Sequence, residues 1–114
     1  MSLSFNSSIS GIRAATVMLN TSANNIANSN TDGYKKQQVN LRGDHDSGVI
    51  VDITERTEAG PLYKNNKGDT VEASNVNYIE EIVTQIQARH LFSANAAVLK
   101  HANEAQETII DIIA

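Results

Sequence analysis

Apolar residues recur at alternating steps of four and three along the first part of the chain. The positions are Phe5, Ile9, Ile12, Thr16, Leu19, Ala23 and Ile26, of which only Thr16 is polar. Such steps place side chains on one face of an α-helix, as in a coiled coil. The pattern predicts a helix over residues 7–28 with this row as its packing face.

The middle of the chain loses the helical period. Residues 38–41 and 49–54 alternate in polarity or are β-branched, which is typical of strands. Turns between them are predicted at Gly43, Gly48, Gly60-Pro61 and Gly68-Asp69. We therefore expect a few short strands arranged in hairpins.

A second helical pattern runs from about Asn77 to the end of the sequence. Its row is Val76, Ile79, Val83, Ile86, His90, Ala94, Val98, Ala102, Ala105, Ile109 and Ile112. Asn77 and Glu80 have the spacing of a capping box at a helix start. A helix of about 36 residues would be about 54 Å long. A compact globule of this size has a radius of gyration of only about 13 Å.

Together these patterns predict a mainly α protein with a small β element. Two long terminal helices are expected to form an antiparallel coiled-coil-like pair, with a short β-hairpin region between them. The expected segments are 1–34 (helix and turn), 35–73 (β-rich middle) and 74–114 (long helix), forming one structural unit. Such a pair leaves outer faces uncovered, and the last turns are apolar nearly all round, so other subunits are expected to complete the burial.

Composition narrows the class of protein. The chain has 114 residues, no Cys and a net charge of −4, which fits one domain without a disulfide framework. No apolar window approaches the ~18–20 residues of a membrane span. The mild acidity argues against nucleic acid as a partner. The N-terminus lacks the pattern of a secretory signal peptide, so composition alone favours a cytoplasmic protein.

Polar residues, not charges, keep the first helix in solution. Residues 1–28 carry one charged side chain, Arg13. Asn20, Asn24 and Asn28 lie four apart, on one strip of the helix, where their amides could bond a neighbouring helix. A simpler explanation applies near residue 28: Asn28 or Asn30 ends the helix in the left-handed conformation, before a turn.

The segment SANNIANSNTDGYKK (22–36) resembles the N-terminal signature of the bacterial flagellar rod and hook family. In that signature Ala-Asn-Asn-x-Ala-Asn is followed by Thr-x-Gly-Tyr/Phe-Lys, here residues 23–28 and 31–35. The segment from Ser74 to Glu104 is similar to the family's closing helix, with Asn75-Val76-Asn77, Glu80-Glu81 and Phe92-Ser93-Ala94-Asn95 at the matching places. The short middle and GPLYKNNKGDTVEASNVN look most like a proximal rod protein.

The resemblance implies a structural subunit of the rod that crosses the periplasm in the basal body. Its partners would be other rod subunits, copies of itself and the flagellar type III export apparatus. Export by that route would reconcile a periplasmic destination with the lack of a signal peptide. No enzymatic activity, cofactor or metal is implied.

The rows of both helices are expected to form the core within and between subunits, with asparagines as polar locks and Gly33 permitting the turn. The expected subunit contacts are Ile12, Leu19, Ala23, Asn24, Asn25, Ile26, Asn28, Gly33, Val83, Ile86, Phe92, Ala94, Asn95, Val98 and Ile109. Two other hypotheses remain open: a cytoplasmic coiled-coil adaptor and a small metal-dependent enzyme.

The metal hypothesis depends on Asp44-His45-Asp46, which could supply oxygen and nitrogen ligands. It lacks the further ligands of a defined site, so a polar hairpin tip is the better interpretation. His90 and His101 would lie about 16 Å apart along a helix and could not share an ion. Lys35-Lys36 is expected to be an exposed strand end.

Overall fold

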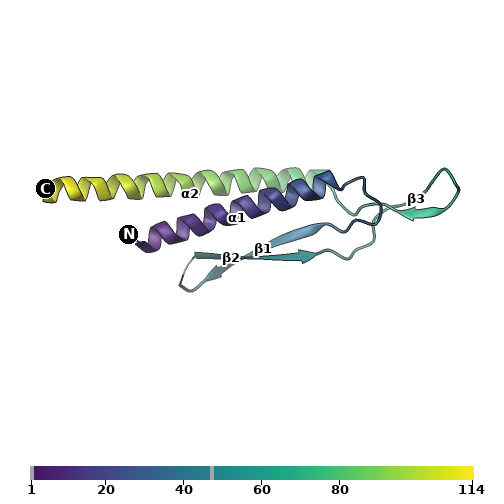
Figure 1. Ribbon diagram of the computed structural model, residues 1–114, viewed down its shortest axis with the longest axis horizontal. Coiled ribbons are helices and arrows are strands. Elements are labelled where there is room, and N and C mark those ends of the chain that lie inside the picture. The colour runs from purple at the N-terminus through teal and green to yellow at the C-terminus, as the bar shows by residue number, and fades with distance from the viewer. Residues whose placement is uncertain (1, 47) are drawn as a thin grey trace.

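The computed structural model describes residues 2–46 and 48–114. Its elements are α1 (Ser2–Ala27), β1 (Gln37–Asp44), β2 (Gly48–Glu55), β3 (Leu62–Lys64), β4 (Thr70–Glu72) and α2 (Tyr78–Ile113). Two helices with a small two-sheet β region between them confirm the predicted mainly helical class (Figure 1). The shape is elongated, 78 × 23 × 14 Å with a radius of gyration of 20.0 Å.

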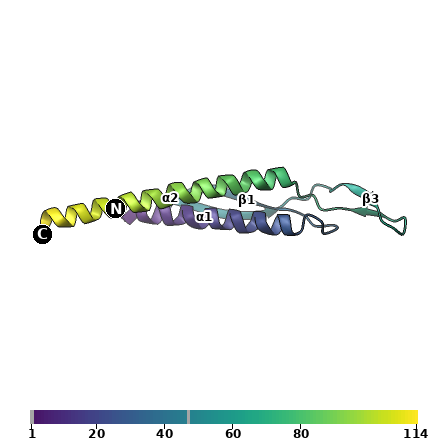
Figure 2. The same ribbon diagram turned by 90° about the horizontal axis from the view of Figure 1, so that it is seen from above.

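The two helices lie side by side in both views (Figures 1 and 2). Ser22 Oγ donates to the Glu81 carbonyl (3.1 Å) near one end of the contact. Near the other end Gly11 lies against Asn95, where an added Cβ would come within 2.5 Å of the Asn95 amide nitrogen. The chain therefore runs in opposite directions in the two helices, and the Asn95 side chain occupies the space that a side chain at position 11 would need.

Small and polar residues, not the apolar row, form the inward face of α1. The buried positions Ser8, Gly11, Ala15, Ser22 and Asn25 follow steps of three, four, seven and three. This is the predicted row displaced by one residue, or about 100° around the helix. The small side chains permit the close approach to α2, and the larger apolar side chains are turned outward.

The inward face of α2 also departs from its predicted row, by two positions at Glu81 and Ala88 and by one at Asn95, whereas Ala102 belongs to the row. Its inward face has Glu81 and Ala88 buried and Asn95 and Ala102 half-buried, at steps of seven. The predicted apolar rows therefore remain largely in solvent. Exposed fractions are 38% for Ile9, 46% for Leu19, 47% for Val83, 51% for Ile86 and 48% for Val98. The prediction that these rows pack the core within one chain is wrong.

The β1–β2 hairpin lies along α1. It pairs antiparallel from Gln37↔Glu55 to Asp44↔Gly48, so both predicted strands are present. β1 has eight residues instead of the four predicted, because it continues through Gly43, where the prediction of a turn is wrong. At its tip the Val49 N–H donates to Ser10 Oγ (3.1 Å). Gly48 has φ of 99°, and a Cβ there would lie 2.3 Å from Ser10 Oγ. Glycine therefore suits this position because it tolerates the positive φ and has no side chain to clash with Ser10.

The second hairpin, β3–β4, lies at the end of the molecule away from the chain termini (Figure 1). Gly33 turns the chain there with φ of 72°, as predicted, and its N–H donates to the Glu72 carbonyl (2.9 Å). The left-handed cap expected at Asn28 or Asn30 is wrong, because no non-glycine residue in the described ranges has positive φ. Glycine adopts this conformation without steric cost, so the turn falls at Gly33.

The start of α1 differs from its predicted position, and the start of α2 does not. α1 begins at Ser2 instead of residue 7, whereas α2 starts after Asn77 as predicted. Asn77 Oδ1 accepts from the Ile79 N–H (2.9 Å), while the Glu80 carboxylate pairs with Lys36. Neither helix has, over its described residues, the length of apolar sequence that crossing a membrane would require.

Candidate assembly surface

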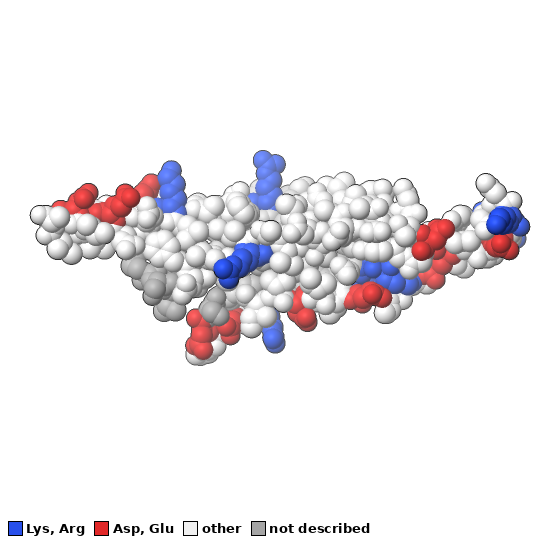
Figure 3. All heavy atoms as spheres, viewed as in Figure 1, with Lys and Arg blue, Asp and Glu red and all other residues white. Residues whose placement is uncertain are grey.

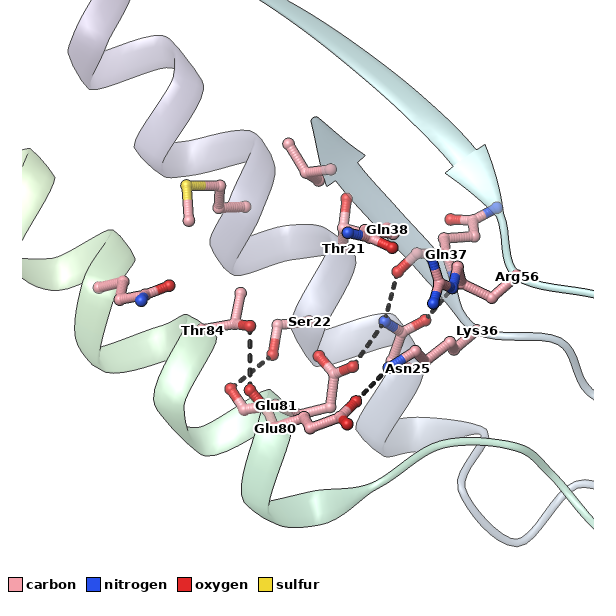
Figure 4. A pocket seen from close by; sticks show the side chains of 13 residues that line it. Thr21, Ser22, Asn25, Lys36, Gln37, Gln38, Arg56, Glu80, Glu81 and Thr84 are labelled. Carbon is pink, nitrogen blue, oxygen red and sulfur yellow. Dashed lines mark hydrogen bonds and ion pairs between the residues drawn. The ribbon is translucent and has the colours of Figure 1, made fainter. Parts of the chain in front are cut away.

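Asn25 is the centre of a polar junction that joins the three main parts of the fold. Its side chain is 1% exposed. The amide nitrogen donates to the Gln37 carbonyl (2.7 Å) and to Glu81 Oε1 (3.0 Å). Its oxygen accepts from the Tyr34 hydroxyl (3.0 Å) and the Gln37 N–H (2.9 Å). One side chain thus fastens α1 to the start of β1 and to α2 (Figure 4).

Glu81 is the charged member of this junction. It is 5% exposed, and its backbone carbonyl also accepts from Ser22. Burial raises the pKa of the Tyr34 hydroxyl, and the nearby charges of Glu81 and Glu55 raise it further. Tyr34 therefore stays protonated and donates to Asn25 across the neutral range. The arrangement fixes the position of Asn25 between the two helices and the start of β1.

Two ion pairs hold the segment before β1 in place. Lys35 pairs with Glu72 and also donates to the Glu58 carbonyl (3.0 Å), and Lys36 pairs with Glu80. Both lysines are half-buried, so the expectation of an exposed strand end is wrong. The partners are about forty residues away along the chain, which a local pattern cannot indicate. The hydrogen bonds from the lysines lower the pKa of the Glu72 and Glu80 carboxyls.

These lowered pKa values predict acid sensitivity. A carboxyl with a depressed folded-state pKa stabilises the fold above its unfolded value of about 4.3, and loses this as pH falls through the folded pKa. When the pH is lowered from about 5 to 3, the melting temperature of Glu80→Gln should therefore fall by about 2–4 °C less than that of the parent. The difference is small because solvent screens an exposed ion pair. Melting followed by circular dichroism measures this. Asp52→Asn on β2 is the control, and parallel pH profiles for the parent and Glu80→Gln would contradict it.

The other asparagines of the signature have separate positions. Asn24 is exposed. Asn28 donates to the Asn24 carbonyl (2.9 Å) and accepts from Thr31, which satisfies groups at the end of α1. Asn95 donates to the Leu91 carbonyl (2.8 Å) and packs on Gly11. Asn25 alone among these four reaches from α1 into both β1 and α2.

An apolar surface covers the outer faces of both helices. We call it the outer row surface and define it by the exposed positions Ile9, Leu19, Ala23, Val83, Ile86, Phe92, Ala94, Val98 and Ile109. Ile12 and Ile26 lie at its edge and are half-buried. Two of its members, Leu19 and Phe92, line an apolar groove of about 420 Å³ between the helices. Large apolar patches on a folded chain mark interaction sites.

The residues considered as metal ligands lie on the surface of the molecule. His45 and Asp46 form the turn after β1, 3.1 Å apart and almost fully exposed, which agrees with a polar hairpin tip. Ser47 lies outside the described residues. His90 and His101 are exposed, and His101 lies 3.4 Å from Glu104. Within the described ranges no three His, Cys, Asp or Glu side chains are grouped to hold a metal.

Family comparison covers both helices. Residues 5–35 match a family model described as flagella basal body rod protein, and residues 68–112 match one described as flagellar basal body rod FlgEFG protein C-terminal. The chain belongs to the flagellar rod and hook family. A search of curated proteins gave no match. In this rod and hook protein the first matched region contains Asn25 and Tyr34, and the second contains Glu81.

Family membership indicates a structural subunit that assembles with other rod subunits in the flagellar basal body. The sequence interpretation missed the small-residue face of this rod and hook protein, although Ser8, Gly11, Ala15 and Ser22 also follow helical steps. It missed Glu81 as well. A sequence signal for this contact did exist. Glu81 stands at the start of the second predicted helix, and in an antiparallel pair that start lies beside the asparagine-rich end of the first helix.

Proposed function

We propose that the chain is a structural subunit of the proximal rod, of the FlgC type, which polymerises through its terminal helices to build the drive shaft. The observation that carries this is the outer row surface. Leu19, Ile86 and Val98 are each about half-exposed although the helices already pack on each other. In an assembly these side chains would pack against neighbouring subunits, which supplies the burial that one chain lacks.

The helix pair suits such a role. Pairing through small residues brings α1 and α2 close together and turns an apolar row of each helix outward. Antiparallel coiled-coil-like packing would then involve helices of several chains. The expected contact set, including Ala23, Asn24 and Ala94, lies mostly on this outer face. The side chain of Asn25 instead forms its hydrogen bonds within its own chain. We therefore assign Asn25 the role of positioning the β1–β2 hairpin against the helices.

We further propose that the subunit leaves the cell through the flagellar type III apparatus and resides in the part of the rod that crosses the periplasm. The weakly charged α1 supports this location. Arg13 is its one charged residue within residues 5–27, and a helix meant for solvent usually has a charged face.

A second candidate is another axial member of the family. It is favoured by the match of residues 68–112 to the family model described as flagellar basal body rod FlgEFG protein C-terminal. The short middle segment, residues 35–73, supports the proximal rod instead, because its described residues form two small hairpins.

Fractionation tests this proposal. Hook–basal bodies isolated from cells that express the chain would be probed by mass spectrometry, with export-defective cells as the control. We expect strong enrichment in basal bodies and its loss when export fails. Peptides of the chain found only in the cytosol would contradict the proposal and favour the coiled-coil adaptor.

A further inference from the structure

The β1–β2 hairpin has two strand edges that belong to no larger sheet in the described chain. Each strand has eight residues, neither strand contains Pro, and the two form a sheet by themselves. Strands in globular proteins usually have about five or six residues, and natural sheet edges tend to be short, interrupted or covered. A long edge that is left open presents N–H and C=O groups with which another strand can pair.

The ladder between the strands fixes which backbone groups point outward. Just outside the strands, the Lys36 carbonyl accepts from the Arg56 N–H (2.9 Å). Even-numbered residues of β1 and β2 therefore direct their backbone groups at each other, and the alternate residues direct theirs away. The outward positions are 37, 39, 41 and 43 on β1 and 49, 51, 53 and 55 on β2.

α1 occupies one outward position on each strand. The Asn25 side chain bonds both backbone groups of Gln37, and Ser10 Oγ accepts from the Val49 N–H. These two positions lie at opposite corners of the hairpin, because Gln37 is at its base and Val49 is near its tip. The other outward positions have no further hydrogen-bond partner within the described residues. We call them the open edges: Val39, Leu41 and Gly43 on β1, and Val51, Ile53 and Glu55 on β2.

We propose that the open edge of β1 in one copy pairs with the open edge of β2 in a second copy, as antiparallel strands. Strand addition to a sheet edge is a common recognition mode, in which main-chain hydrogen bonds supply the affinity. One register pairs all three positions of each open edge. A shift by two residues in either direction leaves one position on each edge without a partner. The pairs in this register are Val39 with Glu55, Leu41 with Ile53, and Gly43 with Val51.

The side chains match in the same register. Arg42 of one copy would lie directly opposite Asp52 of the next, on the same face of the sheet. Both side chains are exposed, and neither forms an ion pair within the described part of the chain. Leu41 and Ile53, which are 41% and 47% exposed, would meet on the opposite face. Figure 3 shows both acidic and basic side chains over this hairpin. Charge complementarity of this kind favours one register over others.

This contact joins two different edges, so it is heterologous and can repeat from copy to copy. The hairpins of successive copies would form one sheet in which all hairpins point the same way. The contact lies outside the terminal helices, and it rests on the proposed rod function, which brings the copies together. Pairing of two β1 edges would instead be two-fold symmetric and would point the copies in opposite directions. It would place Arg42 opposite Asn40, so it lacks the charge match.

Cysteine cross-linking tests this register, since the chain has no Cys of its own. Cells lacking the parent gene would co-express two variants, Arg42→Cys and Asp52→Cys, and isolated basal bodies would be oxidised. The two Cα atoms would be about 4.5 Å apart in a non-hydrogen-bonded pair, which a disulfide can bridge. We expect a disulfide-linked dimer that contains both variants. Thr54→Cys replaces Asp52→Cys in the control and should give at least about tenfold less dimer, because its Cα would be about 8 Å away.

The outcomes separate the contact from the function. Dimer specific to Arg42→Cys with Asp52→Cys supports the edge pairing. If mass spectrometry finds both variants in basal bodies but no specific dimer forms, the edge pairing is overturned and the rod function stands. Dimer of Arg42→Cys with Asn40→Cys instead would overturn it in favour of paired β1 edges. If the parent chain itself is missing from basal bodies, the rod function is overturned and the edge pairing with it.

Proline provides an independent test that involves no cysteine. Leu41→Pro removes an outward N–H that the single hairpin does not use, and proline is tolerated at such edge positions, so the free chain should stay folded. Incorporation into basal bodies should fall about tenfold relative to Leu41→Ala, which also loses the apolar side chain but keeps the N–H. Thermal melting of both purified variants, followed by circular dichroism, checks the fold. Equal incorporation of the two folded variants would contradict the edge pairing.

Discussion

Replacing Asn25 with alanine is expected to lower the free energy of unfolding by about 3–5 kcal/mol. The substitution removes four hydrogen bonds at a site that is 1% exposed. It leaves the Glu81 carboxylate, the Tyr34 hydroxyl and both backbone groups of Gln37 without these partners. A buried polar group that loses its partner costs about 1–3 kcal/mol. Water in the adjoining polar hollow offsets part of the total, so the costs do not simply add (Figure 4).

Urea unfolding followed by circular dichroism at 222 nm measures this difference. Asn24→Ala is the matched control, because Asn24 is the adjacent asparagine and its side chain is exposed. The control should change stability by less than about 0.5 kcal/mol. Equal unfolding midpoints for the Asn25 and Asn24 variants would show that the junction does not hold the fold together.

Leu19→Asp is expected to abolish incorporation into the rod while leaving the free chain folded. Leu19 is 46% exposed at the mouth of the groove between the helices, so a carboxylate there can reach water in the single chain. In the assembly the same position would be covered by a neighbour, and an unpaired charge removed from water costs several kcal/mol. Ala23→Asp, also on the exposed face, should act in the same way.

Swimming motility and basal-body content measure the effect, and thermal melting of the purified chain measures the fold. Thr57→Asp adds the same charge to the exposed segment after β2 and serves as the control. The control should swim normally. Normal motility with Leu19→Asp would contradict an interface at this position, whereas loss of the folded helix content would assign Leu19 to the fold instead.

The types of secondary structure could be predicted from local signals. Helical steps in the two terminal segments predicted α1 and α2, and β-branched alternation predicted β1 and β2. Gly33, Gly48 and Gly68 all have positive φ, at turns that the sequence indicated or the family signature contained. These signals depend on neighbours in the sequence, so they can be interpreted without the tertiary structure.

The face on which each helix packs could not be predicted by the same means. Two rows, one residue apart, both follow helical steps on α1: the apolar row with Leu19 and the small-residue row with Gly11. Periodicity predicts that the more apolar row is buried first. This holds for a chain that completes its own core, but here the small row permits close helix contact and the apolar row stays outside.

The partners in the polar junction around Asn25 also could not be predicted from local sequence patterns. Asn24, Asn25 and Asn28 are the same residue type in one short segment, and only the fold shows that Asn25 meets Glu81, 56 positions later. Lys36 pairs with Glu80 across 44 positions for the same reason. Such pairs arise because α2 returns beside α1, a consequence of the whole topology.

The proposed rod function requires that neighbouring subunits cover the outer row surface. Maleimide labelling of single cysteines tests it most directly, with Leu19→Cys and Ile86→Cys compared between the purified chain and isolated basal bodies. Lys67→Cys, in the exposed turn between β3 and β4, provides the control for access. We predict rapid labelling of both positions in the free chain and protection in basal bodies, with the control labelled in both. Equal labelling of Leu19→Cys and Ile86→Cys in the two samples would contradict the claim.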